Sequence, residues 1–172
     1  RWKPLLNSSR HIVYDDPWPA NGPVIGRTNV RDENIERLTS SLCYSDVQIS
    51  VSSTMTIDGS IFDRPQIGPA YDDRPEGKLD QICYELYLRE HYLPITNSGG
   101  LDLVRSRSAM INAVRDALND PSRLAEGRKQ LVREICTYTD GQCTSRVDSA
   151  LRSFITNHQA TFSNQLEQAA VV

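Results

Sequence analysis

The chain carries four cysteines, and three of them have similar neighbours. Cys43 lies in "SLCYSD", Cys83 in "QICYEL" and Cys136 in "EICTYTDGQC", which ends on Cys143. In each stretch an apolar residue precedes the cysteine, and a tyrosine and an acid follow it. A thiol that recurs in one setting is useful as a covalent handle, so the pattern indicates one chemical task done more than once. The alternative is a disulfide between Cys136 and Cys143, with the other two cysteines as small buried or paired thiols.

Acidic and basic residues stand close to these cysteines in the chain. A thioether-bound cofactor needs a carboxylate or carbonyl to accept its N–H donors, and Arg or Lys to hold its acids. The candidate ligands are Asp46, Glu85 and Asp140, one near each of the three related cysteines. Haem attachment would require Cys-x-x-Cys-His, which is absent. A linear tetrapyrrole does not require that motif. The other charged neighbours are Arg37, Lys78, Asp80, Arg133 and Glu134.

The remaining chemistry-bearing residues do not form an enzyme motif. Cys83 and His91 are eight residues apart on one predicted helix, a separation of roughly 12 Å along its axis, so they cannot share a proton directly. The acid pairs lie in predicted turns or first helical turns, where acids are favoured for structural reasons. Walker, dinucleotide-binding, nucleophile-elbow and zinc patterns are missing. We therefore expect a protein that is not an enzyme and binds no metal.

Composition excludes several other functions. The 172 residues have a net charge of −3 and a hydrophobic share of 38%; the pI is about 5.6 and the mean hydropathy −0.48. Phosphate backbones attract clustered Lys and Arg, so nucleic acid is not an expected partner. No apolar run approaches the roughly 20 residues that cross a bilayer, so membrane insertion is not expected either. The thin apolar supply favours burial against other protein subunits.

The pattern of apolar residues predicts a mainly α fold in three parts. Residues 1–30 read as an extended arm, because prolines and turn formers prevent a long helix there. Residues 31–77 hold a short helix, then alternating residues that fit a small β-hairpin or an extended crossing, then a Pro/Gly-rich loop. Residues 78–172 form a helical region of amphipathic hairpins. Two long irregular segments in one small chain favour a protein shaped by its partners.

Cysteine sites with adjacent charges, in a helical chain with extended arms, resemble the chromophore-bearing linker (γ) subunits of red-algal phycoerythrin. The resemblance rests on "LCYSD", "ICYEL" and "ICTYTDGQC" and covers pieces of the chain. It implies bilins on Cys43, Cys83 and Cys136, with Cys143 taking the far end of one bilin or closing a disulfide. It also implies a place inside a ring of partner subunits in the phycobilisome, on the chloroplast thylakoid, with a role in light harvesting.

We therefore expect a non-enzymatic assembly or linker subunit that carries covalent bilins. The alternative is a secreted or surface interaction protein with two disulfides, for which the Asn7 sequon gives mild support. A helical structural subunit, such as a filamentous coat protein, is a third interpretation. A cysteine-dependent enzyme comes last.

Overall fold

The computed structural model describes residues 8–13, 32–72 and 82–169, with side chains as far as residue 158. The chain divides into two units, residues 1–44 and 45–172. In the first unit, α2 spans Asp32–Tyr44, as the pattern of apolar residues predicts. Residues 8–13 form turns without a helix or strand. The rest of the predicted arm lies outside the described residues.

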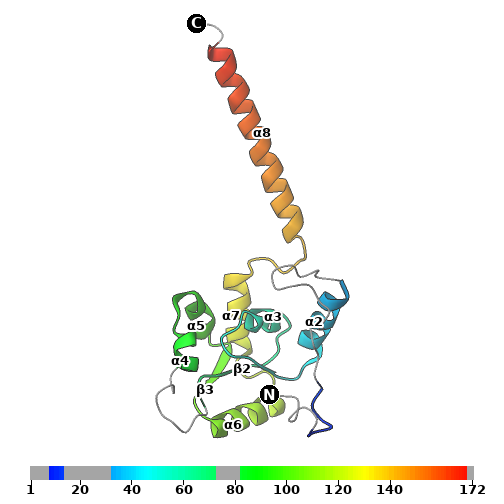
Figure 1. Cartoon of the computed structure of the whole chain (residues 1–172), viewed down its shortest axis with the longest axis vertical. Helices are drawn as coiled ribbons and strands as arrows, with labels where there is room; N and C mark the ends of the chain where they lie inside the picture. The colour runs from blue at the N-terminus through cyan, green and yellow to red at the C-terminus, as the bar shows by residue number, and fades with distance from the viewer. Residues whose placement is uncertain (1–7, 14–31, 73–81, 170–172) are drawn as a thin grey trace. The chain divides into compact units, whose positions relative to one another are not determined.

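The second unit contains a three-stranded parallel sheet (Figure 1). Strand β1 is Gln48–Ile49, β2 is Gln66–Pro69 and β3 is Leu101–Val104, and β2 lies in the middle. In the register, Ile67 stands opposite Ile49 on one side and Asp102 on the other. Parallel strands require a crossover connection between them. Helices supply both crossovers.

The predicted β-hairpin is wrong. Residues 48–49 do form a strand, but the segment that follows is helix α3, Met55–Ile61. The buried positions of α3 are Thr56, Gly59 and Ser60 rather than large apolar residues. Two of them satisfy their hydroxyls inside the core, since Ser60 donates to the Thr56 carbonyl at 2.7 Å and Thr56 pairs with Tyr92 at 3.1 Å. A helix whose buried face is small and polar gives no apolar period to detect.

The predicted Pro/Gly-rich loop contains the central strand. Ile67 in this strand and Ala70 directly after it are each only 1% exposed. They are buried because helices cover both faces of the sheet. Backbone bonds continue the pairing past both ends, from Gln48 N–H to the Pro65 carbonyl and from Ala70 N–H to the Val104 carbonyl. Three residues between Pro65 and Pro69 are too few for a periodic pattern.

The described chain is mostly helical, which confirms the coarse prediction. Beyond the sheet, a helical segment connects β2 to β3, and longer helices follow β3. Their bounds are α4 Ile82–Tyr87, the 3-10 helix η1 Glu90–Tyr92, α5 Leu93–Asn97, α6 Arg107–Asn119, α7 Ala125–Ile135 and α8 Cys143–Ala169. The region predicted to be helical throughout therefore includes strand β3.

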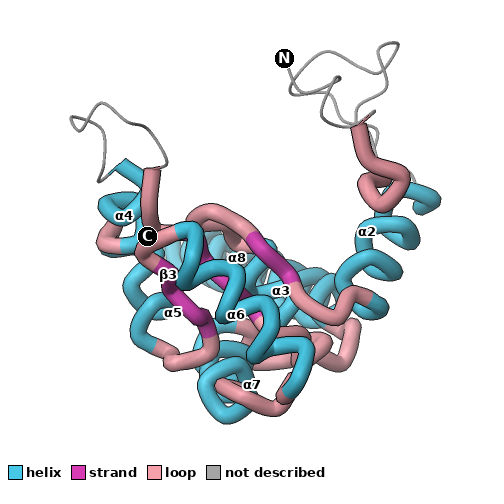
Figure 2. Tube along the Cα trace, turned by 90° about the horizontal axis from the view of Figure 1, so that it is seen from below, coloured by secondary structure: helices cyan, strands magenta, loops and turns pink. Residues whose placement is uncertain are grey.

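Two apolar clusters pack on opposite faces of the sheet. On one face α6 contacts β2 and β3 (Figure 2), and its Ala113 and Ala117 pack with Ile67 and Val104. On the other face the helical segment between β2 and β3, together with α3 and α7, builds the second cluster. That cluster contains Ala70, Tyr87, Tyr92, Ile95, Leu101 and Leu131.

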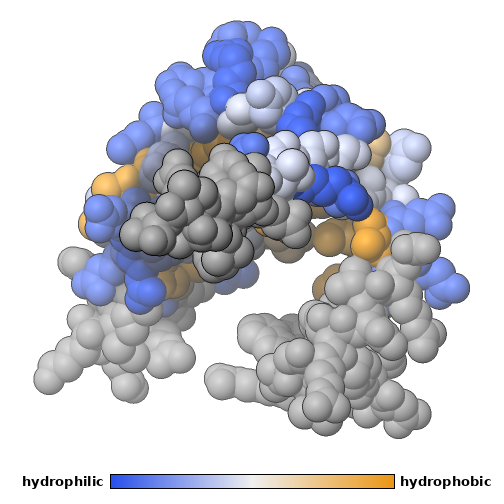
Figure 3. Space-filling view, turned by 90° about the horizontal axis from the view of Figure 1, so that it is seen from above, coloured by the Kyte–Doolittle hydropathy of each residue, from blue (hydrophilic) through white to orange (hydrophobic). Residues whose placement is uncertain are grey.

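Apolar side chains also remain exposed on α8. Val147, Leu151, Phe154 and Ile155 recur at helical spacing and are each more than half exposed. Hydrophilic residues dominate the face seen in Figure 3, with small hydrophobic areas between them. In the part of the chain that the structure describes, no helix has both the length and the apolar character needed to span a bilayer.

Candidate functional site

The structure places the four cysteines on different elements. Cys43 lies on α2 and Cys83 on α4, whereas Cys136 caps the end of α7 and Cys143 begins α8. All four belong to the described residues, and all are free thiols. The alternative of a protein held by two disulfides therefore has no support.

The three acids predicted to accept the N–H donors of an attached bilin lie in different surroundings. Asp140 accepts a hydrogen bond from Arg146 Nη1 at 2.9 Å, and this partner lowers the pKa of its carboxyl. Glu85 is exposed on α4, and Asp46 is exposed in the connection before β1. The carboxylate that does contact a cysteine is Asp72, at 3.1 Å from Cys83 Sγ. Bilin attachment at these cysteines stays a prediction.

Polar residues gather instead where the three parallel strands end. Ligands of open α/β sheets bind at the carboxyl ends of the strands. Residues 50–54, with the sequence Ser-Val-Ser-Ser-Thr, follow β1, and residues 70–72 follow β2. After β3 comes Arg105-Ser106-Arg107-Ser108, which leads into α6. These segments form the candidate site, which we call the strand-end site.

The loop after β1, residues 50–54, has a strained and well-anchored backbone. Ser52 adopts the left-handed conformation, with a φ of 37°, which non-glycine residues seldom occupy. Its hydroxyl donates to the Leu86 carbonyl at 3.2 Å. Tyr87 Oη donates to the Ser50 carbonyl at 3.1 Å, and Tyr92 Oη donates to the Ser53 carbonyl at 3.2 Å. Strain of this kind persists only where surrounding contacts hold it, as these three hydrogen bonds do here.

The other two strand ends are tied to the start of α4. Asp72 accepts from the Cys83 backbone N–H and from its thiol, both at 3.1 Å. Burial raises the pKa of the Cys83 thiol, and the hydrogen bond and negative charge of Asp72 raise it further. The next residue, Tyr84, lies under the Arg105 guanidinium, 3.6 Å from ring centroid to Cζ. Asp72 and Arg105 thus contact consecutive residues of one helix.

Two arginines lie at this edge of the sheet, together with the Asp72 carboxylate. Arg105 and Arg107 are both exposed, and no acid lies in the first turn of α6. Ser106 is the N-cap of that helix and accepts a hydrogen bond from Ala109 N–H at 3.1 Å. The amino end of a helix carries partial positive charge and spare N–H groups, which favour anions. The arrangement suits a phosphate-bearing ligand.

The Tyr87 hydroxyl makes stability depend on alkaline pH. Tyr87 is completely buried, and burial raises its pKa to about 12, above the unfolded value of about 10. The folded state therefore holds the proton more tightly. The resulting stabilisation is complete below pH 10 and is lost as the pH rises to 12.

Tyr87→Phe removes this contribution. The free energy of unfolding of the wild-type chain, relative to that of Tyr87→Phe, should therefore fall by on the order of 2 kcal/mol between pH 10 and pH 12. Urea unfolding at several pH values measures it, and parallel profiles would contradict it.

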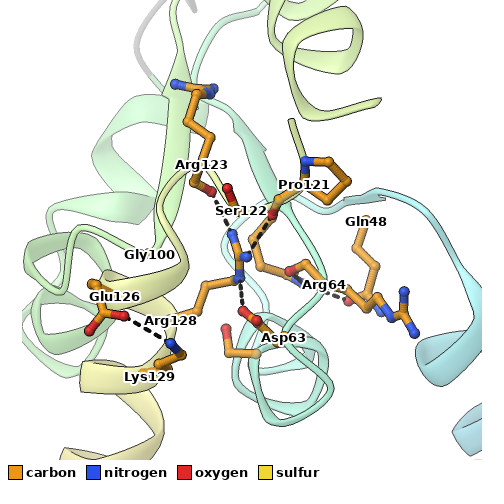
Figure 4. Close-up of polar contacts among 12 residues, drawn as sticks. Gln48, Asp63, Arg64, Gly100, Pro121, Ser122, Arg123, Glu126, Arg128 and Lys129 are labelled. Atoms are coloured by element: carbon orange, nitrogen blue, oxygen red, sulfur yellow. Dashed lines mark hydrogen bonds and ion pairs between the residues drawn. The ribbon is translucent and has the colours of Figure 1, made fainter. Parts of the chain in front are cut away.

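A second polar cluster lies at the opposite edge of the sheet, where β2 and β3 begin (Figure 4). Arg128 on α7 is 1% exposed and donates to Asp63 Oδ1 at 2.7 Å. It also donates to the carbonyls of Pro121 and Arg123, both at 2.8 Å. A small hollow next to this cluster is lined by residues of β2, β3, α6 and α7. Each of the three guanidinium nitrogens of Arg128 donates a hydrogen bond within the protein, so we interpret the cluster as structural.

Sequence reasoning missed the residues of the strand-end site. Ser52, Ser53 and Arg105 were not candidates, because serines in a presumed hairpin and an arginine before a presumed helix carry no motif. The available signal was a hydroxyl-rich run, "SVSST", directly after a short apolar strand. Metal ligands give no competing site, since no three His, Cys, Asp or Glu side chains of the described residues gather to hold an ion.

Parallel strands with helices on both faces define a small α/β unit, and its carboxyl edge carries two arginines and several hydroxyl groups. Within that class the chain belongs to the CDP-glycerol:poly(glycerophosphate) glycerophosphotransferase family, whose family model matches residues 26–152. Neither the curated proteins nor the solved structures contain a match to the chain.

Family membership corrects several expectations drawn from the sequence. The chain is not a phycoerythrin linker subunit, and nothing supports light harvesting or a place on the chloroplast thylakoid. The expectation that it is not an enzyme is also wrong, because the family is one of transferases. Protein partners, and the exclusion of nucleic acid and membrane insertion, stay predictions.

Proposed function

We propose that the chain binds a CDP-glycerol-like donor at the strand-end site and serves glycerophosphate transfer to a hydroxyl acceptor. The family name supplies the donor and the reaction class. The observation that supports this location is the convergence of three strand-end segments with the Arg105 and Arg107 side chains and the amino end of α6.

The reaction asks for little covalent chemistry from the protein. The acceptor oxygen bonds to the glycerol-bearing phosphorus, the pyrophosphate P–O bond breaks, CMP leaves, and the acceptor hydroxyl gives its proton to a base. Phosphoryl transfer is catalysed mainly by positioning and charge stabilisation. Arg105 and Arg107 provide charge for the donor phosphates after β3, and the hydroxyls of Ser53 and Thr54 lie on the loop after β1, with the end of β2 between them. Arginine suits this task because its planar fork matches phosphate oxygens.

The first prediction for this function concerns Arg105. Titration calorimetry should show CDP-glycerol binding to the wild-type chain, and Arg105→Ala should weaken it about tenfold, the effect of losing a charge-assisted hydrogen bond to phosphate. Arg115→Ala is the matched control, because Arg115 is also exposed and lies on α6, where it contacts Asn112 at 3.4 Å. The proposal is wrong if the wild-type chain does not bind CDP-glycerol, or if Arg105→Ala and Arg115→Ala lose the same amount of affinity for it.

A further inference from the structure

One short segment of the chain contacts all three strand ends. Residues 82–92, which include α4 and η1, are part of the connection between β2 and β3. Their contacts with the loop after β1 come from Leu86, Tyr87 and Tyr92. The end of β2 is reached through Cys83 and Asp72, and the end of β3 through Tyr84 and Arg105.

We propose that the three tyrosines of this segment, Tyr84, Tyr87 and Tyr92, are positioning residues of the strand-end site. They set the geometry of the groups that meet the donor, without touching the donor themselves. The inference rests on the proposed function and deepens it, since it identifies what holds the donor-binding groups in place.

Tyr84 acts through Arg105. An exposed arginine side chain samples many rotamers, and a ligand that requires one of them must restrict the rest. The ring of Tyr84 is partly buried against the core cluster, so it is a fixed surface. The guanidinium lies 3.6 Å from the centroid of that ring, which favours one orientation through cation–π attraction and stacking. Arg105 is therefore preorganised before a phosphate arrives.

Tyr87 and Tyr92 act through the backbone of residues 50–54. Both rings are buried, at 0% and 2% exposure, and they pack edge to face with centroids 5.6 Å apart. Their hydroxyls bond the backbone on either side of Ser52. Burial raises the pKa values of both tyrosines, and hydrogen bonds oppose it: the Ser52 backbone lowers the pKa of Tyr87, and the Thr56 hydroxyl followed by the Ser53 backbone lowers that of Tyr92. The left-handed conformation of Ser52 is thus fixed from the core side, which sets where the loop's hydroxyl groups stand.

A double-mutant cycle tests the role of Tyr84. Donor affinity is measured by calorimetry on the full chain, with CDP-glycerol as the probe. Tyr84→Leu should weaken binding about three- to tenfold, the range expected for a lost cation–π contact. Tyr84→Phe keeps the ring and should recover most of the affinity. In the Arg105→Ala background, Tyr84→Leu should cause no further loss, because its effect passes through Arg105.

Tyr138→Leu is the matched control, since Tyr138 makes the same kind of contact with Arg146 at 3.9 Å. Equal losses in Tyr84→Leu and Tyr138→Leu, or full additivity with Arg105→Ala, would overturn the role of Tyr84. Either result leaves the proposed function intact as long as the wild-type chain binds CDP-glycerol. No binding by the wild-type chain would instead refute the proposed function.

Removal of single hydroxyl groups tests the other two tyrosines. Tyr87→Phe and Tyr92→Phe keep the packed rings, and each should weaken CDP-glycerol binding about threefold or more, the effect of one lost hydrogen bond. Calorimetry on folded protein separates this from stability, because a merely structural hydroxyl would lower the unfolding midpoint and leave the dissociation constant unchanged. Unchanged dissociation constants in both variants would therefore contradict the inference.

Discussion

Arg128→Met is expected to lower the free energy of unfolding of the chain by about 2–5 kcal/mol, because two backbone carbonyls lose their donor at about 1–3 kcal/mol each and the ion pair with the half-exposed Asp63 carboxylate is lost. Arg128 is almost fully buried, and methionine can fill part of the same space. It cannot donate to Asp63 at 2.7 Å or to the carbonyls of Pro121 and Arg123. Two backbone acceptors lose their partner, and each unsatisfied acceptor costs free energy.

The measurement is urea unfolding followed by circular dichroism, with Lys129→Met as the control. Lys129 is the next residue of α7 and pairs with Glu126 at 2.8 Å, but its side chain is 53% exposed. Exposed ion pairs contribute little, so the control should lose no more than about 1 kcal/mol. If both variants unfold at the same urea concentration, the buried cluster does not hold this edge of the sheet.

The reason for this large effect lies in the connections that Arg128 joins. Asp63 follows α3 and precedes β2, whereas Pro121 and Arg123 belong to the connection between α6 and α7. The Arg128 guanidinium forms hydrogen bonds with both connections and so holds them in place relative to each other. These hydrogen bonds allow it to be buried despite its charge.

Long amphipathic helices could be predicted from the sequence, and short strands could not. The existence of α2, α6 and α7 follows from apolar residues at helical spacing, although α7 begins at Ala125 rather than at Pro121, where Asp120-Pro121 indicates a helix start. By contrast, β1 has two residues and β2 and β3 have four each. A strand of that length has too few residues to show a period, and its burial depends on crossovers that bring distant segments together.

The residues of the candidate site could not be predicted from the sequence for a related reason. Arg105 and Tyr84 are twenty-one residues apart in the chain, and Tyr92 and Ser53 are thirty-nine apart. Only the parallel order of the strands brings their ends to one edge. The recurrent cysteines were more visible because each lies beside a tyrosine in the chain. For Cys83 that neighbour, Tyr84, is the residue with a contact in the site.

The absence of known catalytic motifs was a poor argument against an enzyme. Motifs such as the nucleophile elbow mark chemistry in which a side chain attacks the substrate. A donor with an activated pyrophosphate bond brings its own leaving group, so the protein needs positioned charges and hydroxyls. Arg105, Ser53 and Thr54 are common surface residue types, and their role depends on where the fold puts them.

Gly127→Ala should lower the free energy of unfolding by about 2–4 kcal/mol, although alanine is the better helix former by about 1 kcal/mol. A Cβ at Gly127 would stand 2.1 Å from the Gly99 carbonyl carbon and 2.3 Å from Gly100 N. Both are backbone atoms directly ahead of β3, whose register with β2 fixes them, so steric overlap outweighs helix propensity.

Gly99→Ala is the control for Gly127→Ala, because its Cβ meets nothing within 4 Å and only its φ of 74° is unfavourable, a cost of about 1–2 kcal/mol. Urea unfolding of both variants measures the difference. A Gly127→Ala chain as stable as the wild type would show that α7 can move away from the start of β3, and the close backbone contact would then not determine where α7 packs.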